Sequence, residues 1–138
     1  MNNYEMEEDF IPVFLIDGFL EAGKTQFLQF TMDQDYFQTD GKTLLLVCEE
    51  GENEYDEQLL KRSKTSVVYI DSLADMTPER LFELELLNNP ERILIEWNGM
   101  WNLDELRLPD SWRIYQQITI IDMSTFDLYS ANMKPLLY

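Results

Sequence analysis

The stretch IPVFLIDGFLEAGKT, residues Ile11–Thr25, is the strongest indication of the fold in this sequence. Ile11 to Ile16 are apolar at every position, which predicts a strand that is buried on both faces. A loop with two glycines follows, and Lys24 to Met32 then places apolar residues at helical spacing. A strand, a glycine loop and a helix in this order can point backbone N–H groups at an anion. The sequence therefore predicts an anion-binding turn at its first strand–helix junction.

The loop matches the motif G-x-x-x-x-G-K-[ST] at every position. Its residues are Gly18, Phe19, Leu20, Glu21, Ala22, Gly23, Lys24 and Thr25, and Gln26 follows them. We expect Lys24 to reach the β- and γ-phosphates of a nucleotide and the Thr25 hydroxyl to bind Mg²⁺. The alternative is a glycine loop that joins a strand to a helix without binding phosphate.

The rest of the sequence alternates between short apolar runs and helical patterns. Further strands are predicted at Thr43–Cys48, Ser66–Ile70 and Arg92–Glu96, with a fifth inside Trp112–Asp122. Helices are predicted at Tyr55–Arg62, over residues 77–87 with Thr77 as N-cap, and from Ser124 onward. In the second of these helices we expect Leu81, Leu84 and Leu87 on one side. This alternation predicts an α/β fold with a mainly parallel sheet flanked by helices. Together with the G-x-x-x-x-G-K-[ST] motif, which is the P-loop motif, it predicts a fold of the P-loop NTPase kind over residues 1–138.

The composition excludes several classes of function. The 138 residues include no histidine and one cysteine, Cys48, so an internal disulfide, a Cys/His zinc site and a Ser-His-Asp triad are excluded. A metal would therefore rest on oxygen ligands, which suits Mg²⁺. The net charge of −17 argues against nucleic acid and membrane as partners, and serves solubility or attracts a basic partner or a cation. The N-terminal residues lack the pattern of a signal peptide, so we expect a cytoplasmic protein.

Four segments of the sequence resemble the CobW-like GTPases, relatives of the HypB and UreG metallochaperone GTPases. The opening stretch resembles that family's Pro-Val strand followed by Gly-Phe-Leu-Gly-Ala-Gly-Lys-Thr-Thr. CEEGENEYD is similar to its segment Asn-Glu-Phe-Gly, four residues, then Asp, with Glu49, Gly51 and Asp56 at the Glu, Gly and Asp positions. ILIEWNGM resembles a strand that ends in Glu-x-x-Gly, which aligns Glu96 and Gly99. TIIDMSTF is similar to a later strand that ends in Val-Asp-Ala, which aligns Asp122 with the aspartate.

The resemblance implies Mg²⁺-dependent binding of GTP, with slow hydrolysis that is linked to metal delivery or cofactor maturation. Glu49, Asp56 and Glu96 would serve the catalytic step, and these three with Thr25 and Asp122 would form the magnesium site. A client metalloprotein and a homodimer are the partners that it suggests. Each carboxylate also has a structural alternative, which is a solvated loop for Glu49 and Asp56, a buried pair for Glu96 and a cap for Asp122.

The sequence departs from the family pattern at four places. Gln26 replaces a threonine, and Glu21 replaces a glycine, which puts a negative charge near the expected phosphates. The family's Cys-x-Cys-Cys motif is absent, and we expect Cys48 to pack in the sheet. No Asn-Lys-x-Asp motif, which reads guanine in the family, occurs in the chain. Two other functions therefore stay open, namely a non-catalytic interaction module with a vestigial P-loop and an ATP-using P-loop enzyme.

Two features of the second half of the chain complete the expectations. Trp97, Trp101 and Trp112 lie close in sequence, and packing against the sheet is favoured over a partner-docking surface or a wall that stacks on a base. The helix from Ser124 has an apolar face that should continue into a further strand. We therefore expect a fold that is incomplete at its C-terminus, in either the N-terminal portion of a longer GTPase or a shortened homologue.

Overall fold

Five strands form one sheet in the computed structural model, which describes residues 10–18, 23–48 and 55–121. The strands are β1 (Ile11–Gly18), β2 (Thr43–Val47), β3 (Thr65–Tyr69), β4 (Arg92–Glu96) and β5 (Trp112–Ile120). They lie in the order β3-β2-β4-β1-β5, and every pair is parallel. The predicted α/β fold is therefore confirmed, and β1, which leads into the glycine loop, lies between β4 and β5.

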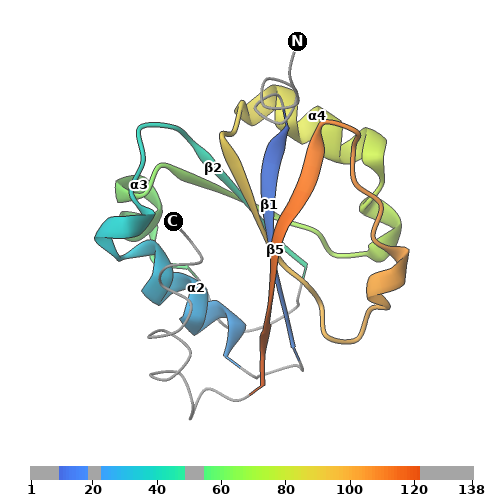
Figure 1. The fold of residues 1–138 in the computed structure, drawn as a ribbon, viewed down its shortest axis with the longest axis horizontal. Coiled ribbons are helices and arrows are strands. Elements are labelled where there is room, and N and C mark those ends of the chain that lie inside the picture. Colours follow the sequence, from blue (N-terminus) through green and yellow to red (C-terminus); the bar gives the residue numbers. More distant parts are fainter. Residues whose placement is uncertain (1–9, 19–22, 49–54, 122–138) are drawn as a thin grey trace.

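Helices cover both faces of the sheet, as Figure 1 shows. Helices α2 (Lys24–Met32) and α3 (Glu57–Arg62) pack on one face, and α4 (Pro78–Asn88) packs on the other. Short 3-10 segments lie at Asp35–Phe37, Leu73–Asp75 and Leu103–Glu105. The side chains of β1 alternate between the two cores, because Phe14 and Ile16 face α2 and α3 while Val13 and Leu15 face α4.

The predicted element bounds agree with the structure to within two residues. Helix 24–32 and strand 92–96 have the predicted bounds, whereas β1 extends two residues further, to Gly18, because β5 continues to pair with it there. The Thr77 hydroxyl accepts a hydrogen bond from the Arg80 N–H at 3.1 Å, which confirms the predicted cap of α4. The helix expected from Ser124 lies outside the described residues.

One detail of the predicted α4 pattern was wrong. Leu81 and Leu84 are buried as expected, but Leu87, which was predicted to share their side, has 77% of its surface exposed. Six residues at 3.6 per turn rotate Leu87 by about 120° from Leu81, so it points away from the sheet.

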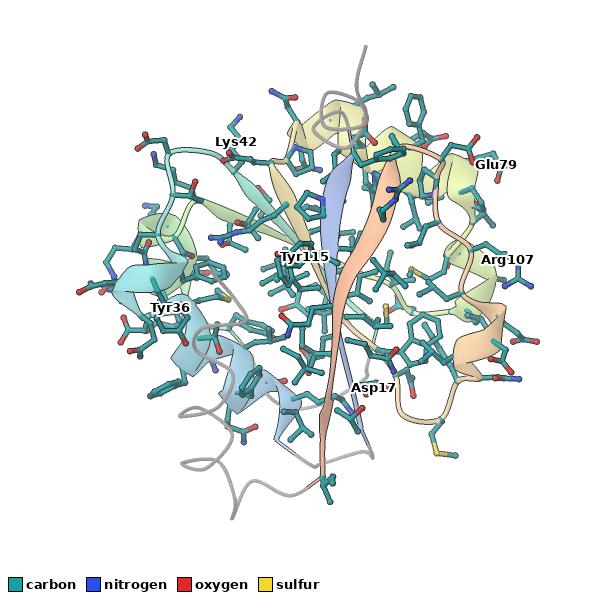
Figure 2. The ribbon with its side chains drawn as sticks, viewed as in Figure 1. Asp17, Tyr36, Lys42, Glu79, Arg107 and Tyr115 are labelled. Atoms are coloured by element: carbon teal, nitrogen blue, oxygen red, sulfur yellow. The ribbon has the colours of Figure 1, made fainter. Side chains whose placement is uncertain are left out.

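Several charged side chains lie around the periphery, as Lys42, Glu79 and Arg107 do in Figure 2. Arg92 differs, because its guanidinium lies 3.6 Å from the centre of the Phe37 ring and donates to the Thr43 hydroxyl at 2.7 Å. Burial lowers the pKa of Arg92 to about 10, and the nearby Glu91 opposes that shift. Within the described parts of the chain, no helix is long and apolar enough to cross a membrane.

Candidate functional site

The carboxyl ends of β1 and β4 meet the start of α2 at one edge of the sheet. Glu96, the last residue of β4, pairs in register with Ile16 of β1 and with Val47 of β2. Because all the strands are parallel, these three strands end at the same edge, which is where open α/β sheets bind their ligands. The structure therefore brings the start of the P-loop motif next to Glu96, although the two are far apart in sequence.

Two glycines shape the backbone on either side of the loop. Gly18 has φ +142° and Gly23 has φ +102°, and both values lie in the region that favours glycine. A β-carbon on Gly18 would also lie 2.2 Å from the carbonyl oxygen of Ile120 in β5. Four motif residues between these glycines, Phe19, Leu20, Glu21 and Ala22, lie outside the described residues. The motif thus has its predicted setting between a strand and a helix that starts at Lys24.

Lys24 and Thr25 begin α2 and are both buried. The Lys24 ammonium donates to the carbonyl oxygen of Gly18 at 2.7 Å, which draws the two ends of the loop together. Gln26 is exposed on the same helix. An ammonium beside the first turn of a helix is an arrangement that can attract a phosphate group.

Glu96 is 1% exposed and is held by two hydroxyl groups. Its Oε1 accepts a hydrogen bond from the Thr25 Oγ1 at 2.6 Å, and its Oε2 accepts one from the Tyr55 phenol at 2.6 Å. A buried carboxyl group needs such donors, because leaving it unpaired away from water is costly. We call Thr25, Glu96 and Tyr55 the hydroxyl–carboxylate triad.

Burial changes the acidity of two groups near Glu96. Burial, reinforced by the Glu96 carboxylate, raises the pKa of the Tyr55 phenol well above its ordinary value, so the phenol keeps its proton at neutral pH. The same two causes raise the pKa of the Cys48 thiol to about 12. Cys48 is 1% exposed and packs beside Met76, so the expectation that it packs in the sheet is confirmed.

Asp56 has a structural position that the sequence left open. It is the N-cap of α3, where its Oδ1 accepts from the Gln58 N–H at 2.9 Å. Its own N–H donates to the side chain of Gln29 in α2 at 3.0 Å, and the residue is exposed. The other two predicted carboxylates, Glu49 and Asp122, lie outside the described residues.

Asparagine at position 56 separates the capping role of Asp56 from a role of its charge. Because asparagine caps helices about as well as aspartate, the free energy of unfolding of Asp56→Asn should lie within about 0.5 kcal/mol of the wild-type value. Asp56→Ala should cost about 1 kcal/mol, since the cap is lost. Urea denaturation measures both. The resemblance implies a role of Asp56 in GTP hydrolysis, and equal rates of hydrolysis for Asp56→Asn and the wild type would contradict that role of the carboxylate.

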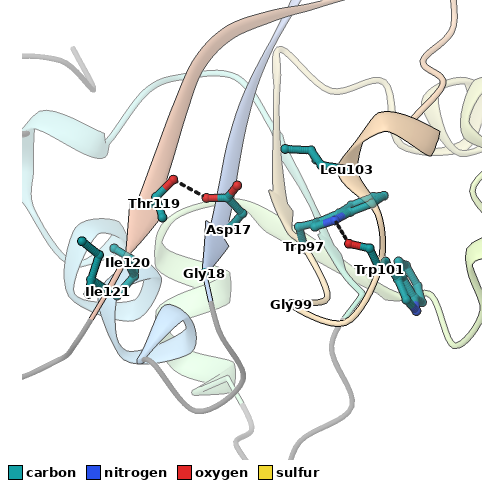
Figure 3. A pocket seen from close by; sticks show the side chains of 9 residues that line it. All are labelled: Asp17, Gly18, Trp97, Gly99, Trp101, Leu103, Thr119, Ile120 and Ile121. Carbon is teal, nitrogen blue, oxygen red and sulfur yellow. Dashed lines mark hydrogen bonds between the residues drawn. The ribbon is translucent and has the colours of Figure 1, made fainter.

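The side of the sheet that faces α4 carries the tryptophans. Trp97 and Trp112 are 2% and 5% exposed, and their indole N–H groups donate to the Trp101 carbonyl at 3.3 Å and to Glu85 at 2.7 Å. The prediction that they pack against the sheet is confirmed for these two. Beside Trp97 and Trp101 lies a pocket of about 200 Å³. Figure 3 shows its walls, which are Asp17, Gly18, Trp97, Gly99, Trp101, Leu103, Thr119, Ile120 and Ile121.

The chemistry of the triad fits a hard cation. The Thr25 hydroxyl and the Glu96 carboxylate offer oxygen atoms, which Mg²⁺ prefers, and they lie 2.6 Å apart. Among the residues that the structure describes, no three acidic or cysteine side chains gather as a metal site of their own. A Mg²⁺ ion bound here would therefore need further ligands, such as the phosphates and water that accompany a nucleotide.

The structure thus brings together two of the predicted site residues, Thr25 and Glu96, with Lys24 beside them. It adds Tyr55, which belongs to none of the motifs found in the sequence. The sequence pattern predicts only that Tyr55 begins a helix. Only the register of the strands, which carries Glu96 to the end of β1, shows that the phenol has a buried partner.

A comparison with protein families matches the profile described as CobW/HypB/UreG, nucleotide-binding domain, over residues 12–135. The matched range covers nearly the whole chain and includes every residue of the triad. Comparisons with curated proteins and with solved structures gave no match.

Proposed function

Because the chain belongs to the CobW/HypB/UreG family of nucleotide-binding domains, we propose that it binds GTP with Mg²⁺ and hydrolyses it slowly. The observation that carries the proposal is the hydrogen bond from Thr25, at the start of α2, to the buried Glu96 at the end of β4. It joins the P-loop motif to the carboxylate for which the family resemblance implies a role as magnesium ligand. The binding site proposed here lies where β1, β4 and α2 meet.

Lys24 would bind the terminal phosphates. The ammonium carries three N–H donors, and it lies at the first turn of α2, whose N-terminus attracts anions. The hydrogen bond to the Gly18 carbonyl holds the ammonium beside the first residue of the motif. A small movement of the side chain would exchange that carbonyl for a phosphate oxygen. A phosphate is the stronger partner because both groups are charged.

Thr25 and Glu96 would hold the Mg²⁺ that accompanies the nucleotide. When bound there, the ion would neutralise the charge that develops on the phosphates during hydrolysis. A carboxylate has about four acceptor positions, and Thr25 and Tyr55 use two of them. Glu96 could therefore also orient the water that attacks the terminal phosphate.

A titration of the 138-residue chain with GTP and ATP, each with Mg²⁺ and with EDTA, tests this proposal. Phosphate contacts do not distinguish the bases, and the sequence lacks Asn-Lys-x-Asp. We therefore expect the two nucleotides to bind with affinities within about tenfold of each other, or ~1.4 kcal/mol. Both should bind more tightly with Mg²⁺ than with EDTA.

The outcomes of this titration separate the alternatives. No binding of either nucleotide would contradict the proposal and would leave a vestigial P-loop in an interaction module. A hundredfold preference for ATP would identify an ATP-using enzyme. A hundredfold preference for GTP would show that the chain already reads the base.

The link to metal delivery and to a client metalloprotein is a further part of the proposal, and a homodimer belongs with it. All three rest on the family resemblance. Cys48 gives no support for a metal cargo, because its buried thiol has a pKa of about 12 and would have to lose its proton to bind a metal.

A further inference from the structure

Tyr55 contacts Glu96 in the candidate site, but it is not a defined position of any motif in the sequence. In the family segment that CEEGENEYD resembles, it falls among the four unspecified residues before the aspartate. Its phenol is nevertheless buried and donates to Glu96 at 2.6 Å. We propose that Tyr55 is a positioning residue that fixes Glu96, so that the Thr25 hydroxyl turns its lone pairs toward Mg²⁺. This inference rests on the proposed function.

The geometry of a hydroxyl group explains why Glu96 matters for Thr25. A threonine hydroxyl has one hydrogen and two lone pairs, and it can either donate to a carboxylate or point its hydrogen elsewhere. In the structure the hydrogen of Thr25 is used by Glu96 Oε1. The lone pairs of the same oxygen are therefore the part of the group that a cation would meet.

The phenol of Tyr55 keeps Glu96 in that orientation. With Oε2 held by Tyr55 and Oε1 by Thr25, the carboxyl group is fixed at both of its oxygens. Without the phenol, the carboxyl group could rotate, and the direction of the Thr25 hydrogen would no longer be defined. Partners of metal ligands typically act in this way, and their loss costs 10- to 100-fold in metal affinity.

Two further features suit Tyr55 to this task. Its position is fixed by the next residue, because the Asp56 N–H donates to Gln29 of α2 and Asp56 caps α3. The phenol is thereby tied to the helix that carries Thr25. Tyr55 is also buried, with 6% of its surface exposed, so little water competes with Glu96 for the phenol hydrogen.

The test compares Tyr55→Phe with the wild type in the full 138-residue chain. A fluorescent GTP analogue is held at a fixed concentration, Mg²⁺ is titrated, and binding of the analogue is recorded from its fluorescence. We expect Tyr55→Phe to need 10- to 100-fold more Mg²⁺ for half-maximal binding, while its GTP affinity in EDTA stays within twofold of the wild type. Tyr115→Phe, which loses an exposed phenol in β5, is the matched control and should not change the Mg²⁺ requirement.

A second comparison shows whether Tyr55 acts through Glu96. In a Glu96→Gln background the carboxylate is already absent, so adding Tyr55→Phe should change the Mg²⁺ requirement by less than twofold. This pair also avoids an unpaired buried carboxylate, which could prevent Tyr55→Phe alone from folding. A further tenfold change in this background would show that Tyr55 does not act through Glu96 and would overturn the proposal.

Two other results separate the inference from the proposed function. If the wild type binds GTP with Mg²⁺ and Tyr55→Phe has the same or a lower Mg²⁺ requirement, the positioning role is wrong while the proposed function stands. If the wild type binds no nucleotide under either condition, the proposed function fails and the inference fails with it.

Discussion

The Lys24→Ala variant is expected to bind GTP about 30- to 150-fold more weakly than the wild type, a loss of ~2–3 kcal/mol. The reason is the loss of a charge-assisted hydrogen bond from the ammonium to the terminal phosphates. Lys24 is 1% exposed and sits at the start of α2, so its charge is in the place that the P-loop motif requires. Isothermal titration calorimetry of both proteins with GTP and Mg²⁺ measures the difference.

The control for this prediction is another lysine of the same chain. Lys42 is exposed and precedes β2, so it lies at the opposite edge of the parallel sheet from the candidate site. Lys42→Ala makes the same change in net charge and should leave GTP binding within twofold. Lys24→Gln, which keeps the length of the side chain, checks that a weakened fold does not cause the loss. Equal GTP affinities for the wild type, Lys24→Ala and Lys24→Gln would contradict an active phosphate-binding loop.

The fold could be predicted from the sequence because local patterns determine most of it. The apolar runs, the glycine loop and the Thr77–Pro78 start of α4 each specify one element, and alternating strands and helices require a parallel sheet. The order β3-β2-β4-β1-β5 could not be predicted in this way, because it depends on which strands pair across long separations in sequence. The predicted orientation of Leu87 was wrong for a different reason, because residues that are six positions apart do not lie on the same side of a helix.

The candidate site was predicted only in part, for the same reason. Lys24, Thr25 and Glu96 belong to patterns that a sequence shows directly, and Thr25 and Glu96 meet in the structure. Tyr55 and Glu96 are 41 residues apart, and no periodicity links a residue before α3 to the end of β4. Asp56 is the opposite case. It was found from its position in a motif, but the motif does not predict that it also caps α3. A contact between distant segments becomes visible only when the register of the sheet is known.

The Gly18→Ala variant is expected to lose about 2–5 kcal/mol of unfolding free energy, measured by urea denaturation. A positive φ costs an L-residue about 1–2 kcal/mol, and forcing an extra carbon into a packed position typically costs 1–3 kcal/mol more. At Gly18 both costs apply, since φ is +142° and the added carbon would lie 2.2 Å from the Ile120 carbonyl oxygen. That oxygen belongs to the backbone of β5, so it can move only if β1 and β5 separate at their ends.

Gly41 provides the control that distinguishes backbone crowding from crowding by a side chain. A β-carbon on Gly41 would lie even closer to another atom, 1.7 Å from the Glu91 Oε2, but that atom ends a flexible side chain. The Glu91 carboxylate can rotate away and give up its 3.1 Å bond to Thr39, but the Glu91 Cβ, which would lie 2.8 Å from the added carbon, can move only with the backbone. Because Gly41 has no positive φ, Gly41→Ala carries the crowding cost alone and should cost about 1–2 kcal/mol, less than Gly18→Ala. Gly18→Ala should also weaken GTP binding, because the Gly18 carbonyl that holds Lys24 would shift, whereas Gly41→Ala should not. If both variants lose the same unfolding free energy, the close approach of β1 and β5 at Gly18 is not what requires a glycine there.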